Sequence, residues 1–209
     1  MNGVLITFEG PDASGKTTQI RLLEEMLRGM GLQPLLTREP GGTPIGERIR
    51  EILLDRSSQE MTPMTEMLLY AASRAQHVEQ VIRPALEAGR IVISDRFTDS
   101  SIAYQGYGRE LGETVARINA IATGGLEPDL TFLLMTTPES MRKRIAEEQQ
   151  DRMEAEQDAF HEKVLRGFLE VHRQHPERIE RIDGTQTIEA IAARIREKAL
   201  AIIRSRYEI

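Results

Sequence analysis

The segment that decides the fold of this 209-residue chain is the loop Gly10-Pro11-Asp12-Ala13-Ser14-Gly15-Lys16-Thr17. It lies between residues 3–9, a short apolar run rich in β-branched residues, and residues 16–30, which have helical spacing. Glycines let the main chain wrap an anion, Lys16 supplies a cation, and the Thr17 hydroxyl can reach a hard metal ion. The segment therefore predicts a site for the phosphates of a nucleotide.

Apolar runs recur along the chain and alternate with segments of helical spacing. Besides the first run, short strands are predicted at residues 33–37, 90–94, 130–135 and 178–182. Helices are predicted at residues 45–54, 63–88, around 138–148 and 187–204. Strands separated by helices form parallel βαβ units that bind ligands beyond the strand carboxyl ends. We therefore expect a single α/β domain over residues 1–209, with a doubly wound, five-stranded parallel sheet flanked by helices.

Composition narrows the classes of partner. A formal net charge of −6 disfavours a nucleic-acid polymer but permits a local basic cleft for a mononucleotide. The chain has no cysteine, which excludes disulfides and thiolate zinc sites. No apolar stretch approaches the roughly 20 residues that a membrane-spanning helix needs. We expect a cytoplasmic protein that binds neither a membrane nor a nucleic-acid polymer.

Charged residues follow two of the predicted strands. Arg38 comes directly after the second strand, and Asp95 and Arg96 come after the third. Because the carboxyl ends of parallel strands meet at one edge of a sheet, these side chains are expected near the phosphate loop. Guanidinium groups suit a phosphate and a carboxylate suits a hard cation. Taken alone, an Asp-Arg pair is more often a surface ion pair than part of a site.

The combined pattern resembles the thymidylate kinase family over nearly the full length of the chain. Its pieces occur in the family's order: the phosphate loop, Thr37-Arg38-Glu39-Pro40-Gly41-Gly42-Thr43, Tyr70-Ala71-Ala72-Ser73-Arg74, Asp95-Arg96-Phe97 and Ala103-Tyr104-Gln105-Gly106. The resemblance implies a P-loop NTPase fold of the nucleoside monophosphate kinase type, with a short mobile lid. It also implies transfer of the γ-phosphate of ATP to dTMP, with Mg²⁺, in the synthesis of dTTP.

The resemblance assigns roles on the donor side of the site. ATP would be bound by the loop residues Gly10, Pro11, Asp12, Ala13, Ser14, Gly15, Lys16, Thr17 and Thr18. Thr17 and Asp95 would serve Mg²⁺, and Lys16, Arg38 and Arg96 would neutralise charge during direct, in-line transfer. An ion pair for the arginines and a strand-end cap for Asp95 are the structural alternatives.

The resemblance also assigns the residues that bind dTMP. Arg38 and Arg96 would hold its phosphate, and Asp12 would approach the 3′-hydroxyl. The remaining acceptor residues would stack on thymine, donate to the base or phosphate, read the base edge or crowd the 2′ position: Tyr70, Arg74, Ser101, Tyr104 and Gln105. Tyr70 stands where the family commonly has a phenylalanine, and an aromatic ring with a polar tip can stack in the same way.

A lid is expected at about residues 142–156. Many bacterial relatives carry several arginines there and end with Asp-Arg-Ile-Glu, whereas this chain is acidic at the centre and matches only at residues 151–154. Arg152 is therefore predicted to touch the transferring phosphate, with Arg142 and Arg144 as alternatives. The turn at residues 183–185 resembles the family's turn near adenine.

Two other functions remain open at this stage. The first is another small-molecule P-loop kinase, and residues 70–74 and 104–105 are the segments that discriminate between acceptors. The second is a nucleotide-binding protein without catalytic activity, which the presence of Arg38, Asp95 and Arg96 disfavours. Apolar residues of the helix from 64 to 88 would pack in a homodimer, although a core helix has the same periodicity. The histidines are predicted to be surface or helix-packing residues outside the site: His77, His161, His172 and His175.

Overall fold

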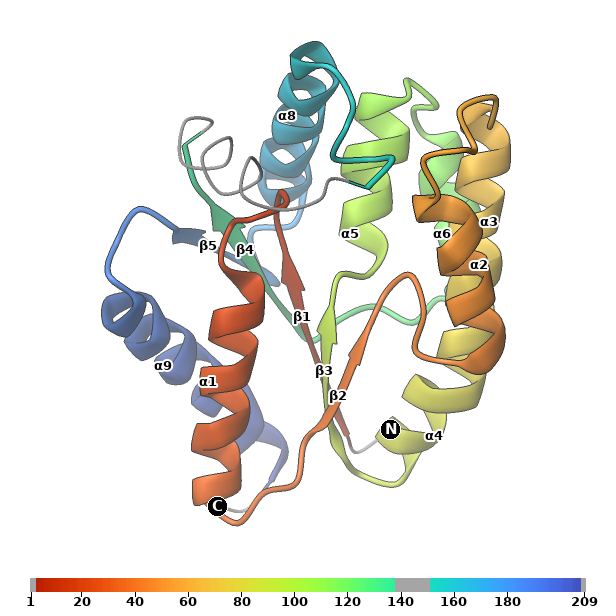
Figure 1. The fold of residues 1–209 in the computed structure, drawn as a ribbon. Helices are drawn as coiled ribbons and strands as arrows, with labels where there is room; N and C mark the ends of the chain where they lie inside the picture. Colours follow the sequence, from red (N-terminus) through yellow and green to blue (C-terminus); the bar gives the residue numbers. More distant parts are fainter. Residues whose placement is uncertain (1–2, 138–150, 208–209) are drawn as a thin grey trace.

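The computed structural model describes residues 3–137 and 151–207 of the chain (Figure 1). Its five strands are β1 (Val4–Glu9), β2 (Leu35–Arg38), β3 (Ile91–Asp95), β4 (Leu130–Met135) and β5 (Ile179–Asp183). They form one parallel sheet in the order β2-β3-β1-β4-β5. The predicted α/β fold is therefore confirmed.

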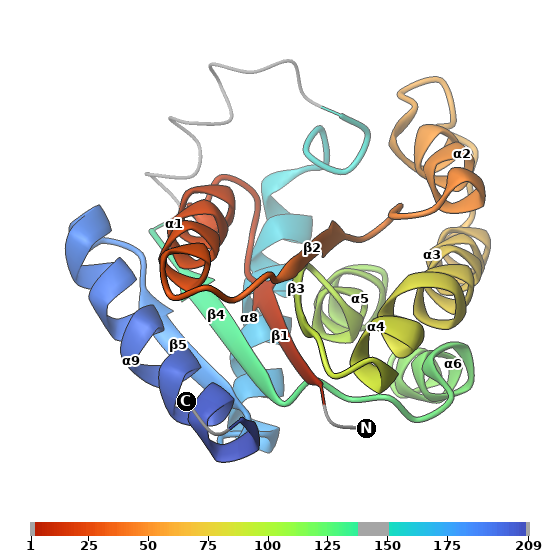
Figure 2. The ribbon, with the colours of Figure 1, turned by 90° about the horizontal axis from the view of Figure 1, so that it is seen from below.

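The two faces of the sheet are covered by different sets of helices (Figures 1 and 2). On one face lie α1 (Lys16–Gly29) and α9 (Ile188–Arg206), where Ile6 and Phe8 of β1 belong to a buried cluster with Leu23 and Ile195. The alternate residue Leu5 faces the other layer. Full burial of such a side chain contributes about 1.5–3 kcal/mol to the free energy of unfolding. Packing against both helical layers therefore stabilises β1.

The second face carries the helices that surround the site. They are α2 (Pro44–Leu54), α3 (Pro63–His77), η1 (Val78–Ile82), α4 (Arg83–Glu87), α5 (Thr98–Ser101), η2 (Ile102–Gly108), α6 (Thr114–Thr123) and α8 (Asp158–Gln174). Threonine caps and a following proline begin α2 and α3, since Thr43 and Thr62 each accept from a main-chain N–H. The helix predicted at 63–88 is interrupted by the π-helical η1, just before Pro84, whose missing N–H disturbs regular bonding.

Four of these helices have no counterpart among the predictions. The elements α5, η2 and α6 have four, seven and ten residues, so their periodicity is weak. In contrast, α8 buries Phe160, Val164, Phe168 and Val171, a spacing that the sequence displays and that could have identified it. The helix predicted around 138–148 and the lid from 142 to 150 fall outside the described residues.

The carboxyl ends of β1, β2 and β3 meet at the upper edge of the sheet in Figure 1. Register places Phe8 beside Asp95, and Asp95 beside Arg38. The residues predicted to follow these strands are therefore neighbours at one edge. Within the described ranges, no helix is long and apolar enough to cross a membrane.

Candidate active site

The phosphate loop connects β1 to α1 in a conformation that requires glycine. Gly10 has φ 131°, and a Cβ there would lie 2.2 Å from the carbonyl oxygen of Leu134. Gly15 has φ 97° and precedes α1 without a side-chain cap. The first turn of α1 contains no acidic residue, so its main-chain N–H groups and positive dipole end favour an anion.

Lys16 lies buried within the loop. Its Nζ donates to the carbonyl oxygens of Gly10 at 3.1 Å and Pro11 at 2.8 Å. Burial, reinforced by the nearby charge of Arg96, lowers the pKa of Lys16 to about 8. An anion placed against the loop would favour the charged ammonium.

A cavity of about 450 Å³ lies on the α1 side of the loop. Its walls also include Glu154, Gly184, Gln186 and two residues from α9. The turn predicted near adenine thus contributes Gly184. The predicted donor residues that line this cavity are Ala13, Ser14, Gly15, Lys16, Thr17 and Thr18.

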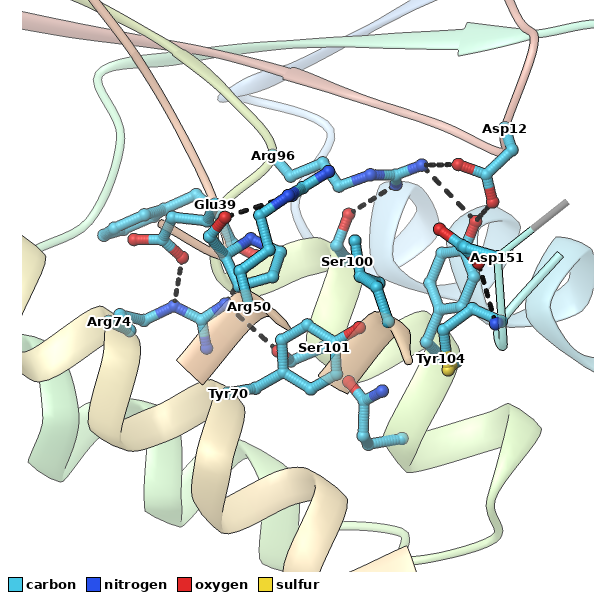
Figure 3. A pocket seen from close by; sticks show the side chains of 15 residues that line it. Asp12, Glu39, Arg50, Tyr70, Arg74, Arg96, Ser100, Ser101, Tyr104 and Asp151 are labelled. Carbon is cyan, nitrogen blue, oxygen red and sulfur yellow. Dashed lines mark hydrogen bonds and ion pairs between the residues drawn. The ribbon is translucent and has the colours of Figure 1, made fainter. Parts of the chain in front are cut away.

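A second cavity, of about 90 Å³, lies on the other side of the loop. It contains most of the predicted acceptor residues, which are Asp12, Tyr70, Arg74, Arg96, Ser101, Tyr104 and Gln105. Figure 3 shows six of them converging from the loop, α3, the turn after β3, α5 and η2: Asp12, Tyr70, Arg74, Arg96, Ser101 and Tyr104. Tertiary structure therefore brings together residues that are separated widely in the sequence.

Asp12 and Arg96 join the two sides of the site. The Arg96 guanidinium donates to Gly10 O at 2.9 Å. It also donates to the Asp12 carboxylate, and the Tyr104 hydroxyl donates to Asp12 Oδ2 at 2.8 Å (Figure 3). Burial opposes ionisation of Asp12, but the charges of Arg96 and Lys16 outweigh it and lower its pKa to about 2. Asp12 is therefore an ionised acceptor at neutral pH.

Arg96 adopts a main-chain conformation that non-glycine residues rarely use, with φ 69°. Buried Glu9, which the sequence analysis did not single out, supports this turn by accepting from Phe97 N at 2.8 Å and from the Ser100 hydroxyl. Burial, and then the charge of Asp99, raises the pKa of Glu9 to about 7.

Arg74 is buried in a network behind the acceptor cavity. It donates to Glu39 at 2.7 Å, Asn119 at 2.5 Å, Phe97 O at 2.9 Å and the Ser101 hydroxyl at 3.0 Å. These contacts use four of its five N–H donors. At most one donor therefore remains for a ligand.

His77 is fully buried in the same network. Its Nδ1 lies 3.0 Å from Glu39 Oε1 and its Nε2 lies 2.6 Å from Thr37 Oγ1. The prediction of a helix-packing histidine fits this position, but His77 also fixes the carboxylate that holds Arg74. No apolar pattern indicates such a role, because it depends on the approach of β2 to α3.

Arg38 is not brought to the acceptor cavity. Its exposed guanidinium makes two bonds to Glu47, at 2.8 and 2.9 Å, and does not line either cavity. Arg50, which the sequence analysis missed, lines the acceptor cavity instead and donates to Pro40 O at 3.1 Å. Burial, with the charge of Arg38, lowers the pKa of Arg50, so the two guanidinium groups lie near each other.

Arg152 also departs from its predicted position. It is buried beside the acceptor cavity, where Nε donates to Leu53 O at 2.8 Å and Nη2 to Glu66 Oε2 at 2.7 Å. The phosphate loop is not among its hydrogen-bonding partners. A buried ion pair holds the guanidinium in place because breaking it would leave the buried charge of Arg152 without its carboxylate partner.

Two predicted metal ligands offer hard oxygen donors. Thr17 is exposed at the start of α1, and Asp95 ends β3 next to β1. Asp95 Oδ1 is buried and has no hydrogen-bond partner among the described residues. A buried carboxylate oxygen without a hydrogen-bond partner suits a hard cation such as Mg²⁺.

Comparisons with known proteins agree with this geometry. The model of the thymidylate kinase family matches residues 8–195. A thymidylate kinase from an Exiguobacterium species is 55% identical over 193 residues, covering 91% of each chain. That of Exiguobacterium sibiricum is 48% identical over 210 residues, covering 99% of this chain and 98% of the relative.

A solved structure extends the likeness to three dimensions. The crystal structure of thymidylate kinase from Ehrlichia chaffeensis has a TM-score of 0.76 and 32% sequence identity, and covers 95% of this chain and 98% of that chain. Sequence and fold thus agree over almost the whole chain. The chain belongs to the thymidylate kinase family.

Proposed function

We propose that the chain transfers the γ-phosphate of ATP to dTMP, giving ADP and dTDP. The observation that carries this proposal is the pair of cavities on opposite sides of the phosphate loop, with Asp12 and Arg96 between them. A donor and an acceptor nucleotide bound on the two sides would bring their phosphates together at the loop. The family relationship supports the same activity.

On the donor side, the loop and Lys16 bind the phosphates of ATP. Lys16 exchanges its carbonyl partners for phosphate oxygens, which are stronger acceptors. Thr17 and Asp95 hold Mg²⁺, which supplies charge neutralisation at the phosphates when it is bound.

On the acceptor side, Tyr70 stacks on thymine, while Tyr104 and Ser101 border the sugar and base. Gln105 binds the edge of the base. Asp12, ionised and held by Arg96, accepts from the 3′-hydroxyl of dTMP. Arg74 offers its remaining donor.

Arginines stabilise the charge of the transferring phosphoryl group. Arg96 lies at the junction of the cavities, and Arg50 supplies a second positive charge at the acceptor side. Arg38 reaches the phosphate by leaving Glu47, because exposed ion pairs hold their partners weakly. Arg152 stays bonded to Glu66 behind the acceptor cavity. A phosphate oxygen of dTMP is itself the nucleophile, so no basic side chain is required.

The proposed active form is a homodimer. Helix α3 exposes Met64 at 39% and Leu68 at 52%, and Ile52 of α2 and Ile121 of α6 are also exposed. A second copy of this chain would bury these apolar side chains. Light scattering at several protein concentrations tests this assembly, and a strictly monomeric mass would contradict it.

A coupled assay of ADP release tests the proposed reaction. ATP and Mg²⁺ are supplied with dTMP, dUMP, dCMP, UMP, CMP, AMP or GMP as acceptor. The highest kcat/KM is expected for dTMP. Preference for another acceptor would refute the assignment of the acceptor cavity, and absence of turnover with every acceptor would refute phosphoryl transfer.

A further inference from the structure

Glu66 of α3 lies behind the acceptor cavity and is almost completely buried, at 1% exposure. Both of its carboxylate oxygens are fully used. Oε1 accepts from Gln105 Nε2 at 3.0 Å and Arg109 Nε at 3.1 Å, and Oε2 accepts from Arg109 Nη2 at 3.0 Å and Arg152 Nη2 at 2.7 Å. Burial alone would raise the pKa of Glu66, but these hydrogen bonds outweigh it and lower the pKa. Glu66 is therefore an ionised group that accepts hydrogen bonds and cannot donate them.

This carboxylate determines which way the Gln105 amide points. Gln105 is 1% exposed and lines the acceptor cavity, whereas Glu66 does not line it. If the amide were turned over, its carbonyl oxygen would face the Glu66 oxygen at the same 3.0 Å separation, placing two acceptors against each other. The amino group is therefore held toward Glu66, and the carbonyl oxygen Oε1 is left on the opposite side.

We propose that Glu66 is a positioning residue that determines base specificity, by fixing Gln105 so that its carbonyl oxygen accepts the N3–H of the acceptor base. Thymine and uracil carry a hydrogen at N3, whereas cytosine has a lone pair there. In the fixed orientation, Gln105 Oε1 binds the first two bases and opposes the third. This inference rests on the proposed binding of dTMP in the acceptor cavity.

Arg109 and Arg152 both donate hydrogen bonds to Glu66. Arg109 directly follows η2, and Arg152 belongs to the segment that follows residue 150. Neither side chain lines the acceptor cavity. Their positive charges keep Glu66 ionised at the depth where an isolated carboxylate would take up a proton. A protonated Glu66 would offer an O–H, against which the reversed amide of Gln105 would also fit.

The test is a comparison of three acceptors with the intact enzyme: dTMP, dUMP and dCMP. In Glu66→Gln, the new amide can accept or donate, so Gln105 is free to turn its amino group toward the base. The ratio of kcat/KM for dUMP to that for dCMP is expected to fall about tenfold or more, since hydrogen-bonding sites discriminate strongly. The ratio of dTMP to dUMP should stay constant, because these acceptors differ only in the methyl group.

Exchanging the side chains at positions 66 and 105 should restore the preference for dUMP over dCMP. In the double variant Glu66→Gln, Gln105→Glu, the amide at 66 donates to the carboxylate at 105, whose second oxygen accepts N3–H. Preference for dUMP over dCMP should return. This variant keeps two arginines and one carboxylate in the cluster. If Glu66→Gln does not fold, the double variant still tests whether residue 105 accepts the N3–H of the base. A folded double variant that lacks the preference would overturn the proposal.

Glu156→Gln is the matched control, because it removes the second carboxylate partner of Arg109 but leaves Arg109, Arg152 and Gln105 bonded to Glu66. Its melting temperature should fall while the ratio of dUMP to dCMP is retained. If Glu66→Gln instead lowers kcat/KM equally for all three acceptors, Glu66 only supports the fold and the proposal fails. If the unmodified chain itself does not prefer dTMP, the proposed function fails first, and the two outcomes are thereby distinguished.

Discussion

The two cavities on either side of the phosphate loop are constructed in different ways. The donor cavity takes its anion-binding groups from one continuous stretch, residues 13–18, with main-chain N–H groups and Lys16. The acceptor cavity takes single side chains from several elements and holds them with buried ion pairs, such as Arg74 with Glu39. Substitutions on the donor side should therefore change chemistry with the fold retained, and those on the acceptor side should change both.

The largest loss of activity is expected at Arg96, which lies between the donor and acceptor cavities. Arg96→Ala removes a positive charge between the cavities and the partner of Asp12. We expect kcat to fall by about 10³ to 10⁵, the range for catalytic arginines in phosphoryl transfer. Steady-state kinetics measures the loss, and circular dichroism checks the fold. Arg117→Ala, at a side chain that is 81% exposed, is the control; turnover retained in Arg96→Ala would remove Arg96 from the mechanism.

Substitutions on the acceptor side should lower the stability of the fold more than substitutions on the donor side. Arg74→Met leaves Glu39 buried with one strong partner fewer, and loss of one member of a buried pair destabilises by about 3–5 kcal/mol. Urea unfolding measures this change. Arg21→Ala, in a pair whose members are 63% and 56% exposed, should leave the midpoint unchanged. Equal midpoints for Arg74→Met and the unmodified chain would contradict the comparison.

The donor side should lose rate without losing stability. Lys16→Ala is expected to reduce kcat by about 10² to 10³, as removal of one charge-stabilising donor does. Because burial lowers the pKa of Lys16 to about 8, its charge is unfavourable in the folded chain, so the variant should be at least as stable at pH 7. Calorimetry of dTMP binding should give an unchanged affinity. A large fall in melting temperature would show that Lys16 is needed for the fold, which would contradict the comparison of the two cavities.

The smallest effect is expected at Glu9, whose carboxylate accepts hydrogen bonds from the turn that contains Arg96. The pKa of Glu9 is raised to about 7 from 4.5, so between these values the folded chain keeps a proton that the unfolded chain releases. Stability should therefore fall as pH rises from about 4.5 to 7. Glu9→Gln lacks this titration and should be more stable than the unmodified chain by about 1–3 kcal/mol at pH 8.

Melting curves from pH 5 to 8 measure this difference between Glu9→Gln and the unmodified chain. The charged groups around Glu9 are Asp99, Arg96, Lys16 and Arg178. Glu25→Gln, at a side chain that is 56% exposed, is the control and should follow the unmodified chain at each pH. A constant difference between Glu9→Gln and the unmodified chain would rule out titration of Glu9 in this range.

Local physical chemistry made the strands and the donor loop predictable from the sequence. The β-branched runs, the spacing of glycines and the helical period of residues 16–30 depend on neighbours along the chain, so β1, the loop and α1 lie where they were expected. Tyr70 and Gln105 were assigned differently, by the family resemblance of the short segments that contain them, and both line the acceptor cavity.

Tertiary structure alone decided how the charged side chains pair. Arg38, Glu47 and Arg50 lie within one short stretch, yet packing of α2 gives Arg38 to Glu47 and turns Arg50 toward the acceptor cavity. Arg152 meets Glu66 across 86 positions of sequence. A long, flexible charged side chain pairs with whichever opposite charge the fold brings within reach. Where the pair is buried, as for Arg152 and Glu66, loss of the partner costs several kcal/mol. Sequence spacing does not specify this pairing, because the partners are brought together only by packing of the helices.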